Sequence, residues 1–311
     1  MAAIETFSLE KHYEVGFWKK RRKDALKPLT LEVQEGEIFG YLGPNGAGKT
    51  TTLRLLMGLV YPSAGSAKIL GCDLFDRKMK QQIGFLPEQP YFYDHLTARE
   101  LLNYYARLSG VDPKSRTKKV EAALARVGMA DAAKTQLRKF SKGMLQRVGI
   151  AQAIVHDPKL ILLDEPMSGL DPIGRREVRD LIQELHESGK TIFFSTHILS
   201  DAETLCDRVA VLNHGELRGI GVVADLAREV TGDVEISWVG GTAQASLESL
   251  GAKIHAAGDA FRAVLPETKQ DAAIDSIRRT GARLISITPV RATLEDYFLE
   301  KLQETPQEVQ R

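Results

Sequence analysis

Eight residues early in the chain have the types and spacing needed to bind phosphate. They run Gly43-Pro44-Asn45-Gly46-Ala47-Gly48-Lys49-Thr50 and fit the pattern G-x-x-x-x-G-K-[ST] at every fixed position. Glycines let the backbone approach an anion, and the free N–H groups of a helix expected to begin at Thr51 would point at it. The motif predicts that Lys49 contacts the β- and γ-phosphates of a nucleotide and that the Thr50 hydroxyl binds Mg²⁺.

Two carboxylates form a second candidate group. Residues 160–163 (LILL) are typical of a buried strand, which is followed by Asp164 and Glu165. An acid at the carboxyl end of a parallel strand faces the ligand crevice, so Asp164 is predicted to bind Mg²⁺ and Glu165 to polarise an attacking water. The alternative is an ordinary helix N-cap region, and the phosphate motif upstream makes the functional interpretation the better one. His197, just past the predicted strand 191–195, is a candidate sensor of the γ-phosphate.

These residues need a framework of strands and helices. Residues 38–42 (IFGYL) predict a buried strand before the phosphate motif, and residues 51–59 predict a helix after it. Between about residues 88 and 157 the pattern becomes helical: a capping box at Thr97 opens one helix, and two more follow. The sequence therefore predicts an α/β core with an all-helical insertion.

The segment before the phosphate motif carries aromatic and basic residues. Tyr13 lies near the end of a predicted strand and either stacks on adenine or is a half-buried strand aromatic. Residues 17–23 (FWKKRRK) could contact anionic lipid or nucleic acid, but we expect a solvated insertion loop.

Composition narrows the class of protein. The 311 residues favour two domains, and a net charge of +1 argues against a dominant nucleic-acid surface. Cys72 and Cys206 have no metal or redox spacing, which indicates a reduced cytosolic setting. The N-terminus does not resemble a signal peptide, and no apolar run approaches the roughly 18–20 residues of a membrane span. Any membrane role is therefore expected to come through a partner.

A second domain is expected from about residue 221. From Val234 onward strands and helices alternate in a βα-type pattern, which predicts a small α+β domain over 221–311. It has no Gly-rich loop, His/Cys cluster or paired acids, so we interpret it as a structural or docking module.

The order of the motifs resembles the ATP-binding subunit of an ABC transporter. GPNGAGKT is similar to its Walker A, FSKGMLQR to its signature, LILLDEP to its Walker B, SGLD to its D-loop and STH to its H-switch. The resemblance covers residues 1–220 and implies a P-loop NTPase core, with a RecA-like sheet, an antiparallel β subdomain and the helical insertion. The C-terminal part resembles the accessory domain of subunits that serve export-type permeases.

The resemblance implies ATP and Mg²⁺ as ligands and a head-to-tail dimer. Each ATP would be clamped between one Walker A and the opposite subunit's signature and D-loop, here Ser141, Lys142, Gly143, Met144 and Asp171. Ser141 and Gly143 open a predicted helix, whose N–H groups suit a phosphate. Lys142 and Met144 depart from the family's usual glycine and glutamine, which puts a polar contact at Met144 in doubt.

A third departure concerns the glutamine that the family carries after the strand at 83–86. Glu88 aligns with it, and Gln89 follows one residue later. A carboxylate at this position could also bind Mg²⁺ or orient water, so both residues stay candidates.

The implied partners are an integral-membrane permease at the cytoplasmic face of the cell membrane and a second ATP-binding subunit, in a homodimer or heterodimer, with no nucleic acid. The leading hypothesis is an ATPase that drives transport, with export as the implied direction. Two alternatives are a soluble ABC ATPase acting on ribosomes or DNA and a P-loop kinase. The first usually has two ATP modules or a long coiled coil, and the second has no role for the signature motif.

Overall fold

A computed structural model describes residues 1–16, 21–226, 232–290 and 294–303. The chain divides into two compact units, residues 1–223 and 224–303. The division lies close to the boundary expected at 220/221. Each unit is described by itself.

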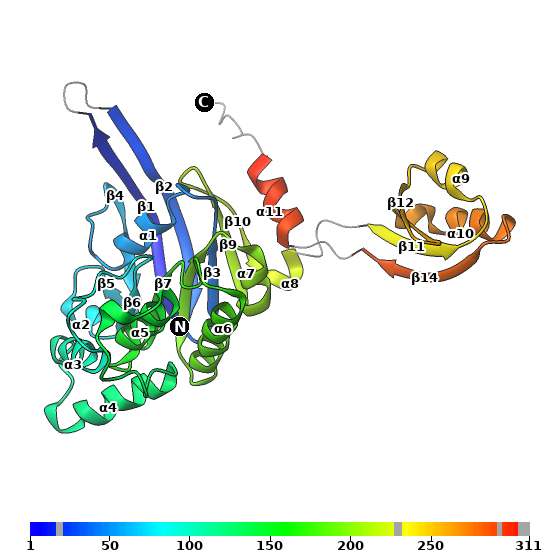
Figure 1. Cartoon of the computed structure of the whole chain (residues 1–311). Coiled ribbons are helices and arrows are strands. Elements are labelled where there is room, and N and C mark those ends of the chain that lie inside the picture. Colours follow the sequence, from blue (N-terminus) through cyan, green and yellow to red (C-terminus); the bar gives the residue numbers. More distant parts are fainter. Residues whose placement is uncertain (17–20, 227–231, 291–293, 304–311) are drawn as a thin grey trace. The chain divides into compact units, whose positions relative to one another are not determined.

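A six-stranded sheet runs through the first unit, in the order β10-β9-β3-β8-β7-β6 (Figure 1). Its strands are β3 (Ile38–Leu42), β6 (Ile83–Leu86), β7 (Leu160–Asp164), β8 (Thr191–Thr196), β9 (Arg208–Asn213) and β10 (Glu216–Val222). All neighbours are parallel except β9 and β10. The carboxyl ends of the five parallel strands therefore meet at one edge, where open α/β sheets bind ligands.

Both faces of this sheet are buried, which explains why its central strands are almost wholly apolar. Side chains alternate along β7: Ile161 and Leu163 join one core, whereas Leu160 and Leu162 join the other. The sequence prediction of buried strands at 38–42 and 160–163 is confirmed, because every residue of β3 and β7 is buried.

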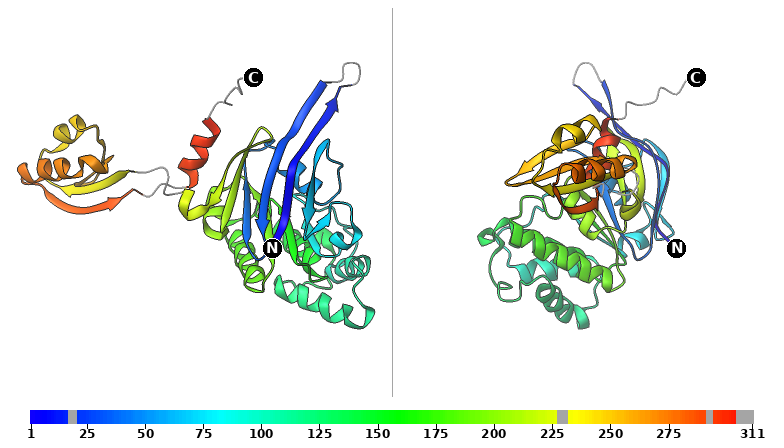
Figure 2. Two further views of the ribbon diagram at one scale, coloured as in Figure 1. Left: turned by 180° about the vertical axis from the view of Figure 1, so that it is seen from behind. Right: turned by 90° about the vertical axis from the view of Figure 1, so that its right-hand side faces the viewer.

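A four-stranded antiparallel sheet covers one core, in the order β2-β1-β4-β5. Its strands are β1 (Ala2–Val15), β2 (Arg21–Gln34), β4 (Ala64–Ile69) and β5 (Cys72–Asp73). Beyond Glu10, β1 pairs only with β2, and both strands extend past the rest of the sheet (Figure 2).

The solvated loop expected over residues 17–23 is wrong in its described part. Residues 21–23 belong to β2 and pair with β1, with Arg21 opposite Val15 and Lys23 opposite Tyr13. Pairing satisfies the backbone N–H and C=O groups, while the charged side chains stay exposed. Residues 17–20 lie outside the described residues.

The helix after the phosphate motif begins earlier than expected. α1 spans Lys49–Leu56 rather than 51–59, because Gly48 adopts φ 110° and the chain turns into the helix directly after it. A Cβ at Gly48 would lie 2.4 Å from the carbonyl oxygen of Ala25, so both the backbone angle and the space require glycine. The early start brings Lys49 into the first helical turn.

Helices pack on the other face of the central sheet. α3 (Ala98–Leu108), α4 (Pro113–Arg126) and α5 (Lys142–Ile154) form the helical insertion, and Thr97 caps α3 with the predicted capping box. The first unit also contains η1 (Leu137–Lys139), α6 (Pro172–Glu187), α7 (Leu199–Leu205) and α2 (Arg77–Lys80), whose Met79 packs into the core beside the antiparallel sheet. α8 (Val223–Leu226) spans the boundary between the two units. In the described part of the chain, every helix is too short or too polar to cross a lipid bilayer.

The second unit contains a four-stranded sheet of order β12-β13-β11-β14. Its elements are β11 (Asp233–Val239), α9 (Gln244–Ser249), β12 (Lys253–Ala257), β13 (Ala260–Pro266), η2 (Glu267–Lys269), α10 (Gln270–Arg279), β14 (Arg283–Pro289) and α11 (Leu294–Gln303). All strand pairs are antiparallel and β12 joins β13 directly, so the βα alternation expected from the sequence breaks there. The core around Trp238 and Ile236 is apolar and includes residues of α9 and α10.

Candidate functional site

An open pocket of about 550 Å³ lies over the phosphate motif, at the edge where the parallel strands end. Its volume suits a small ligand. The lining residues are Tyr13, Lys23, Ala25, Pro44, Asn45, Gly46, Gly48, Lys49, Thr50, Thr51, Glu88 and Glu165. Most of the residues predicted to bind the nucleotide in the chain's own motif therefore meet in one place.

Two members of the motif have other positions. Gly43 is buried behind the pocket, and its carbonyl oxygen accepts a 2.6 Å hydrogen bond from Lys49 Nζ. Ala47 packs into the core shared with the antiparallel sheet. Gly43 and Ala47 therefore support the phosphate loop from its buried side.

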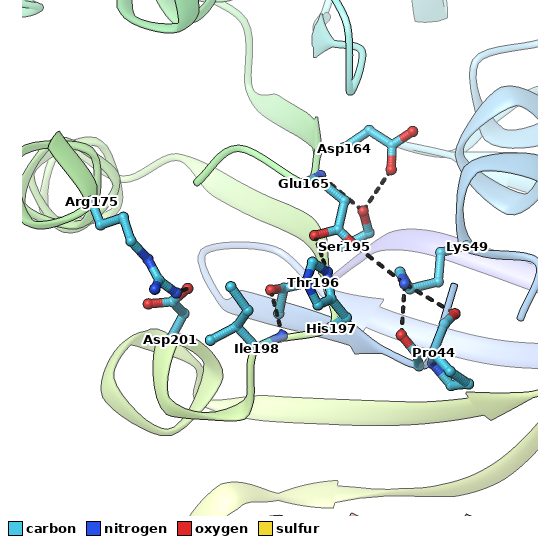
Figure 3. Close-up of polar contacts among 11 residues, drawn as sticks. Pro44, Lys49, Asp164, Glu165, Arg175, Ser195, Thr196, His197, Ile198 and Asp201 are labelled. Carbon is cyan, nitrogen blue, oxygen red and sulfur yellow. Dashed lines mark hydrogen bonds and ion pairs between the residues drawn. The ribbon is translucent and has the colours of Figure 1, made fainter. Parts of the chain in front are cut away.

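Lys49 and Glu165, which line the pocket, form a chain of polar contacts with His197 (Figure 3). Lys49 Nζ lies 3.1 Å from Glu165 Oε1, and the other carboxylate oxygen, Oε2, lies 2.8 Å from His197 Nδ1. Lys49 and Glu165 are each only 6% exposed, whereas the His197 side chain is exposed. Each oxygen of the Glu165 carboxylate therefore has a different partner, Lys49 for Oε1 and His197 for Oε2.

The backbone of Glu165 has an unusual conformation. Its φ is 50°, in the left-handed region, just after β7 ends at Asp164. The Glu165 N–H is directed at Ser195 on β8, at 3.0 Å from its Oγ and 3.2 Å from its carbonyl oxygen. This turn directs the Glu165 side chain toward Lys49 and His197 (Figure 3).

Asp164 is the second buried carboxylate of the site. It is 1% exposed, and its Oδ1 accepts a 2.6 Å hydrogen bond from Ser195 Oγ. Burial raises the pKa of Asp164, and hydrogen bonds from Ser195 and Thr50 oppose that rise. Nearby Glu88 and Glu165 raise the pKa further, so this end of the pocket gathers negative charge that a cation would neutralise.

The donor set around Asp164 suits Mg²⁺. Asp164 and Thr50 supply oxygen ligands and line a neighbouring hollow of about 430 Å³. Mg²⁺ is commonly held by one or two carboxylates together with substrate phosphates. Within the described residues, no three His, Cys, Asp or Glu side chains gather as a metal cage.

Glu88 and Gln89 differ in position. Glu88 lines both the phosphate pocket and the hollow beside Asp164, whereas Gln89 lines only the hollow. Gln89 Oε1 also accepts a hydrogen bond of 3.3 Å from Tyr91. The structure therefore brings Glu88 closer to the phosphate motif.

A second pocket, of about 360 Å³, contains most of the signature residues and shares no lining residue with the first. Ser141, Lys142, Gly143 and Asp171 line it, at the start of α5 and α6. The Met144 side chain packs against the helical core, and its N–H donates to Ser141 Oγ at 3.3 Å. One chain thus separates the phosphate motif from the signature.

Sequence reasoning missed some residues of the site. Lys23 lines the phosphate pocket because it pairs across the hairpin with Tyr13, a register that depends on how far the hairpin extends. Tyr13 itself is half-buried, and Lys11 Nζ lies 5.0 Å from the centre of its ring. The sequence did offer a sign of Ser195, because it is a polar residue that directly follows the apolar run 192–194.

A further missed residue is Asp201 on α7, four positions after His197. It is fully buried and accepts from Arg175 at 2.8 Å and Arg179 at 3.2 Å, both on α6. Figure 3 shows the Arg175 pair beside the site. This ion pair ties the helix after His197 to the helix that begins at Asp171.

Comparison with known proteins gives consistent findings. A family model described as ABC transporter matches residues 26–168. An uncharacterized ABC transporter ATP-binding protein of Synechocystis sp. is 46% identical, over 97% of this chain and 85% of the relative. The bacitracin transport ATP-binding protein BcrA of Bacillus licheniformis is 46% identical, over 61% of this chain and 62% of its own. The solved structure of a dimeric ATP-binding cassette in a post-hydrolysis state with ADP and Pi is similar with a TM-score of 0.65 and 27% identity, covering 70% of this chain and 98% of that one.

Proposed function

Because the chain belongs to the ATP-binding subunits of ABC transporters and is an ATP hydrolase, we propose that it pairs head to tail with a second subunit and drives export through a separate membrane permease. The permease would hold it at the cytoplasmic face of the membrane. The second subunit is a copy of this chain or a related one.

The observation that carries the paired arrangement is the division of the nucleotide-binding residues between two pockets. Lys49 and Glu165 line one pocket, whereas Ser141 and Asp171 line the other, and the two share no residue. A single chain can offer an ATP only one of these surfaces at a time. A second subunit turned head to tail would bring its Ser141 pocket over the first subunit's phosphates, and the dimeric form of the solved cassette supports this.

In the proposed mechanism, Lys49 and the N–H groups at the start of α1 bind the β- and γ-phosphates. Thr50 and Asp164 would hold Mg²⁺, with Glu88 beside them, and the ion would neutralise charge on those phosphates. Glu165 accepts a proton from the attacking water. A bond forms between the water oxygen and the γ-phosphorus, the bond from that phosphorus to the β–γ bridging oxygen breaks, and ADP and phosphate leave.

The nucleotide also changes the state of Glu165. In this structure Lys49 is paired with Glu165, so the phosphates must draw the ammonium away before Glu165 can act as a base. His197, at 2.8 Å from the same carboxylate, then holds the γ-phosphate and keeps the water aligned. ATP binding thereby frees Glu165 to act as the base in ATP hydrolysis.

For the C-terminal unit we propose a structural or docking role, because its core is a closed apolar cluster around Trp238. Removing the chain after Val223 should leave ATP binding within about twofold of the full chain and weaken dimer formation or coupling to the permease. A folded truncated protein that no longer binds ATP would contradict this role.

Reconstitution tests the proposed function. The chain is purified with the membrane protein from the neighbouring reading frame and placed in lipid vesicles, with the ATP-binding subunits outside. If the pair exports, added ATP moves labelled bacitracin, chosen because of the BcrA relative, into the lumen and raises phosphate release. ATP-driven loss of cargo from the lumen would reverse the direction, and ATP hydrolysis that never responds to the membrane protein would reject the transporter pairing.

A further inference from the structure

Ser195 is a polar side chain in the buried part of the central sheet. It lies near the carboxyl end of β8, is 0% exposed, and pairs in register with Asp164 of β7. The residues before it, Ile192, Phe193 and Phe194, are fully buried and apolar. A hydroxyl in such surroundings is costly unless it forms hydrogen bonds, so its partners indicate why it is there.

The Ser195 hydroxyl uses both of its capacities on the two acidic residues of the site. Its O–H donates to Asp164 Oδ1 at 2.6 Å, and its oxygen accepts from the Glu165 N–H at 3.0 Å (Figure 3). A hydroxyl has one proton to donate, and the carboxylate takes it. One side-chain oxygen therefore connects two consecutive residues that have different tasks.

Each bond fixes a different feature. The bond to Oδ1 occupies one oxygen of the buried Asp164 carboxylate and sets the orientation of the group, to which the Thr50 hydroxyl also bonds. The bond from the Glu165 N–H stabilises its left-handed backbone, from which the side chain reaches Lys49 and His197. Loss of the hydroxyl would free the Asp164 carboxylate and leave the Glu165 N–H with the Ser195 carbonyl oxygen, 3.2 Å away, as its acceptor.

We propose that Ser195 is a positioning residue that sets the Mg²⁺-facing carboxylate and the general base together. The inference rests on the proposed function, in which Asp164 faces the cation and Glu165 accepts the proton. Ser195 itself is 0% exposed. It acts through the two acids, in the way that groups behind a metal ligand orient that ligand.

Three variants of the full chain test this role. Ser195→Ala deletes the hydroxyl, and Ser195→Cys fills nearly the same space with a weak donor. Thr191→Val is the matched control. Thr191 lies at the other end of β8, is 2% exposed, and its hydroxyl accepts from the Gly36 N–H at 2.8 Å, so its loss also removes one buried hydrogen bond.

The main measurement is the binding of a fluorescent ADP analogue during a Mg²⁺ titration, which needs no turnover. Ser195→Ala and Ser195→Cys should raise the half-saturating Mg²⁺ concentration by about 10- to 100-fold. In EDTA their affinity for the analogue should stay within about twofold of wild type. The kcat for ATP should remain lowered at saturating Mg²⁺, because the Glu165 turn also loses one of its two acceptors on Ser195. Thr191→Val should match wild type in the titration.

A wild-type Mg²⁺ titration in the Ser195→Cys variant would overturn the proposal, and so would an equal loss of binding with Mg²⁺ and with EDTA, which would mean general damage to the pocket. If Ser195→Ala proves too unstable to titrate, the Ser195→Cys result decides. The wild-type chain keeps the two hypotheses apart: if its own binding does not respond to Mg²⁺, the proposed metal role fails whatever Ser195 does.

Discussion

The two pockets of the first unit differ in how far their polar groups are buried. In the phosphate pocket, Lys49 and Glu165 are buried and paired. In the second pocket, Ser141, Lys142 and Asp171 are exposed. The first pocket is a preassembled group of buried charges, and the second is an open surface.

Two side chains of the second pocket cap the helices from which they project. Ser141 Oγ caps α5 by accepting from the Met144 N–H, and Asp171 Oδ1 caps α6 by accepting from the Gly174 N–H at 2.9 Å. Each cap needs only its own helix. In the proposed mechanism, the residues that carry out hydrolysis are therefore assembled within one chain, whereas the second pocket meets a nucleotide only when another subunit brings it.

The largest expected effect comes from removing the base of the preassembled pocket. Glu165→Gln should lower the rate of phosphate release by about 10²–10⁴-fold, because the amide cannot accept the water's proton. It should also bind ATP more tightly than wild type, since the ion pair with Lys49 no longer competes with the phosphates. Equilibrium ATP binding and single-turnover hydrolysis check both, with the exposed Glu187→Gln as control, and wild-type turnover in Glu165→Gln would reject it as the base.

Removing the positively charged lysine of the same pocket should have the next largest effect. Lys49→Ala should lower hydrolysis by about 10²–10³-fold, the size found for loss of a preorganised charge-stabilising group, and weaken nucleotide binding. The Lys68→Ala variant on β4 removes an exposed lysine and should do neither. Near-normal turnover in Lys49→Ala would contradict the assignment of hydrolysis to the phosphate pocket.

The open pocket should respond differently. Ser141→Ala should lower stability by about 1 kcal/mol through the lost cap and weaken the ATP-bound dimer about fivefold, while a single chain binds ATP as before. Sedimentation in the Glu165→Gln background measures the dimer. Thr97→Ala, which removes the cap of α3 at a distance from both pockets, is the control for stability. If it weakens the dimer equally, Ser141 has no role beyond capping.

The smallest expected effect on hydrolysis comes from Glu88, which lines the phosphate pocket. Glu88→Ala should lower hydrolysis by about two- to threefold, the size of a weak hydrogen bond, and Gln89→Ala should leave it unchanged without the permease. Steady-state rates of the two variants decide the assignment. A larger loss in Gln89→Ala would give Gln89 the position that alignment gives to Glu88.

Sequence reasoning succeeded where the structure is local. The phosphate motif carries its own strand, turn and helix within some twenty residues, so its pocket could be predicted from spacing. Even there, the start of α1 at Lys49 depended on the backbone angle of Gly48, which residue types alone do not give.

It failed where the structure depends on strand order. Ser195 meets Asp164 because β8 lies next to β7, although 31 positions separate the two residues. Lys23 reaches the pocket because the β1–β2 pairing continues beyond the rest of the sheet. Neither follows from periodicity, since both are products of pairing between distant segments.

The left-handed backbone of Glu165 has a consequence for how this chain can evolve or be engineered. A residue with a side chain in that conformation is disfavoured by about 1–3 kcal/mol, which the surrounding bonds must offset. Glycine or asparagine would relieve that strain but would also leave the buried Lys49 without its carboxylate partner. The ion pair that ties Glu165 to Lys49 therefore opposes the replacement that the backbone alone would favour.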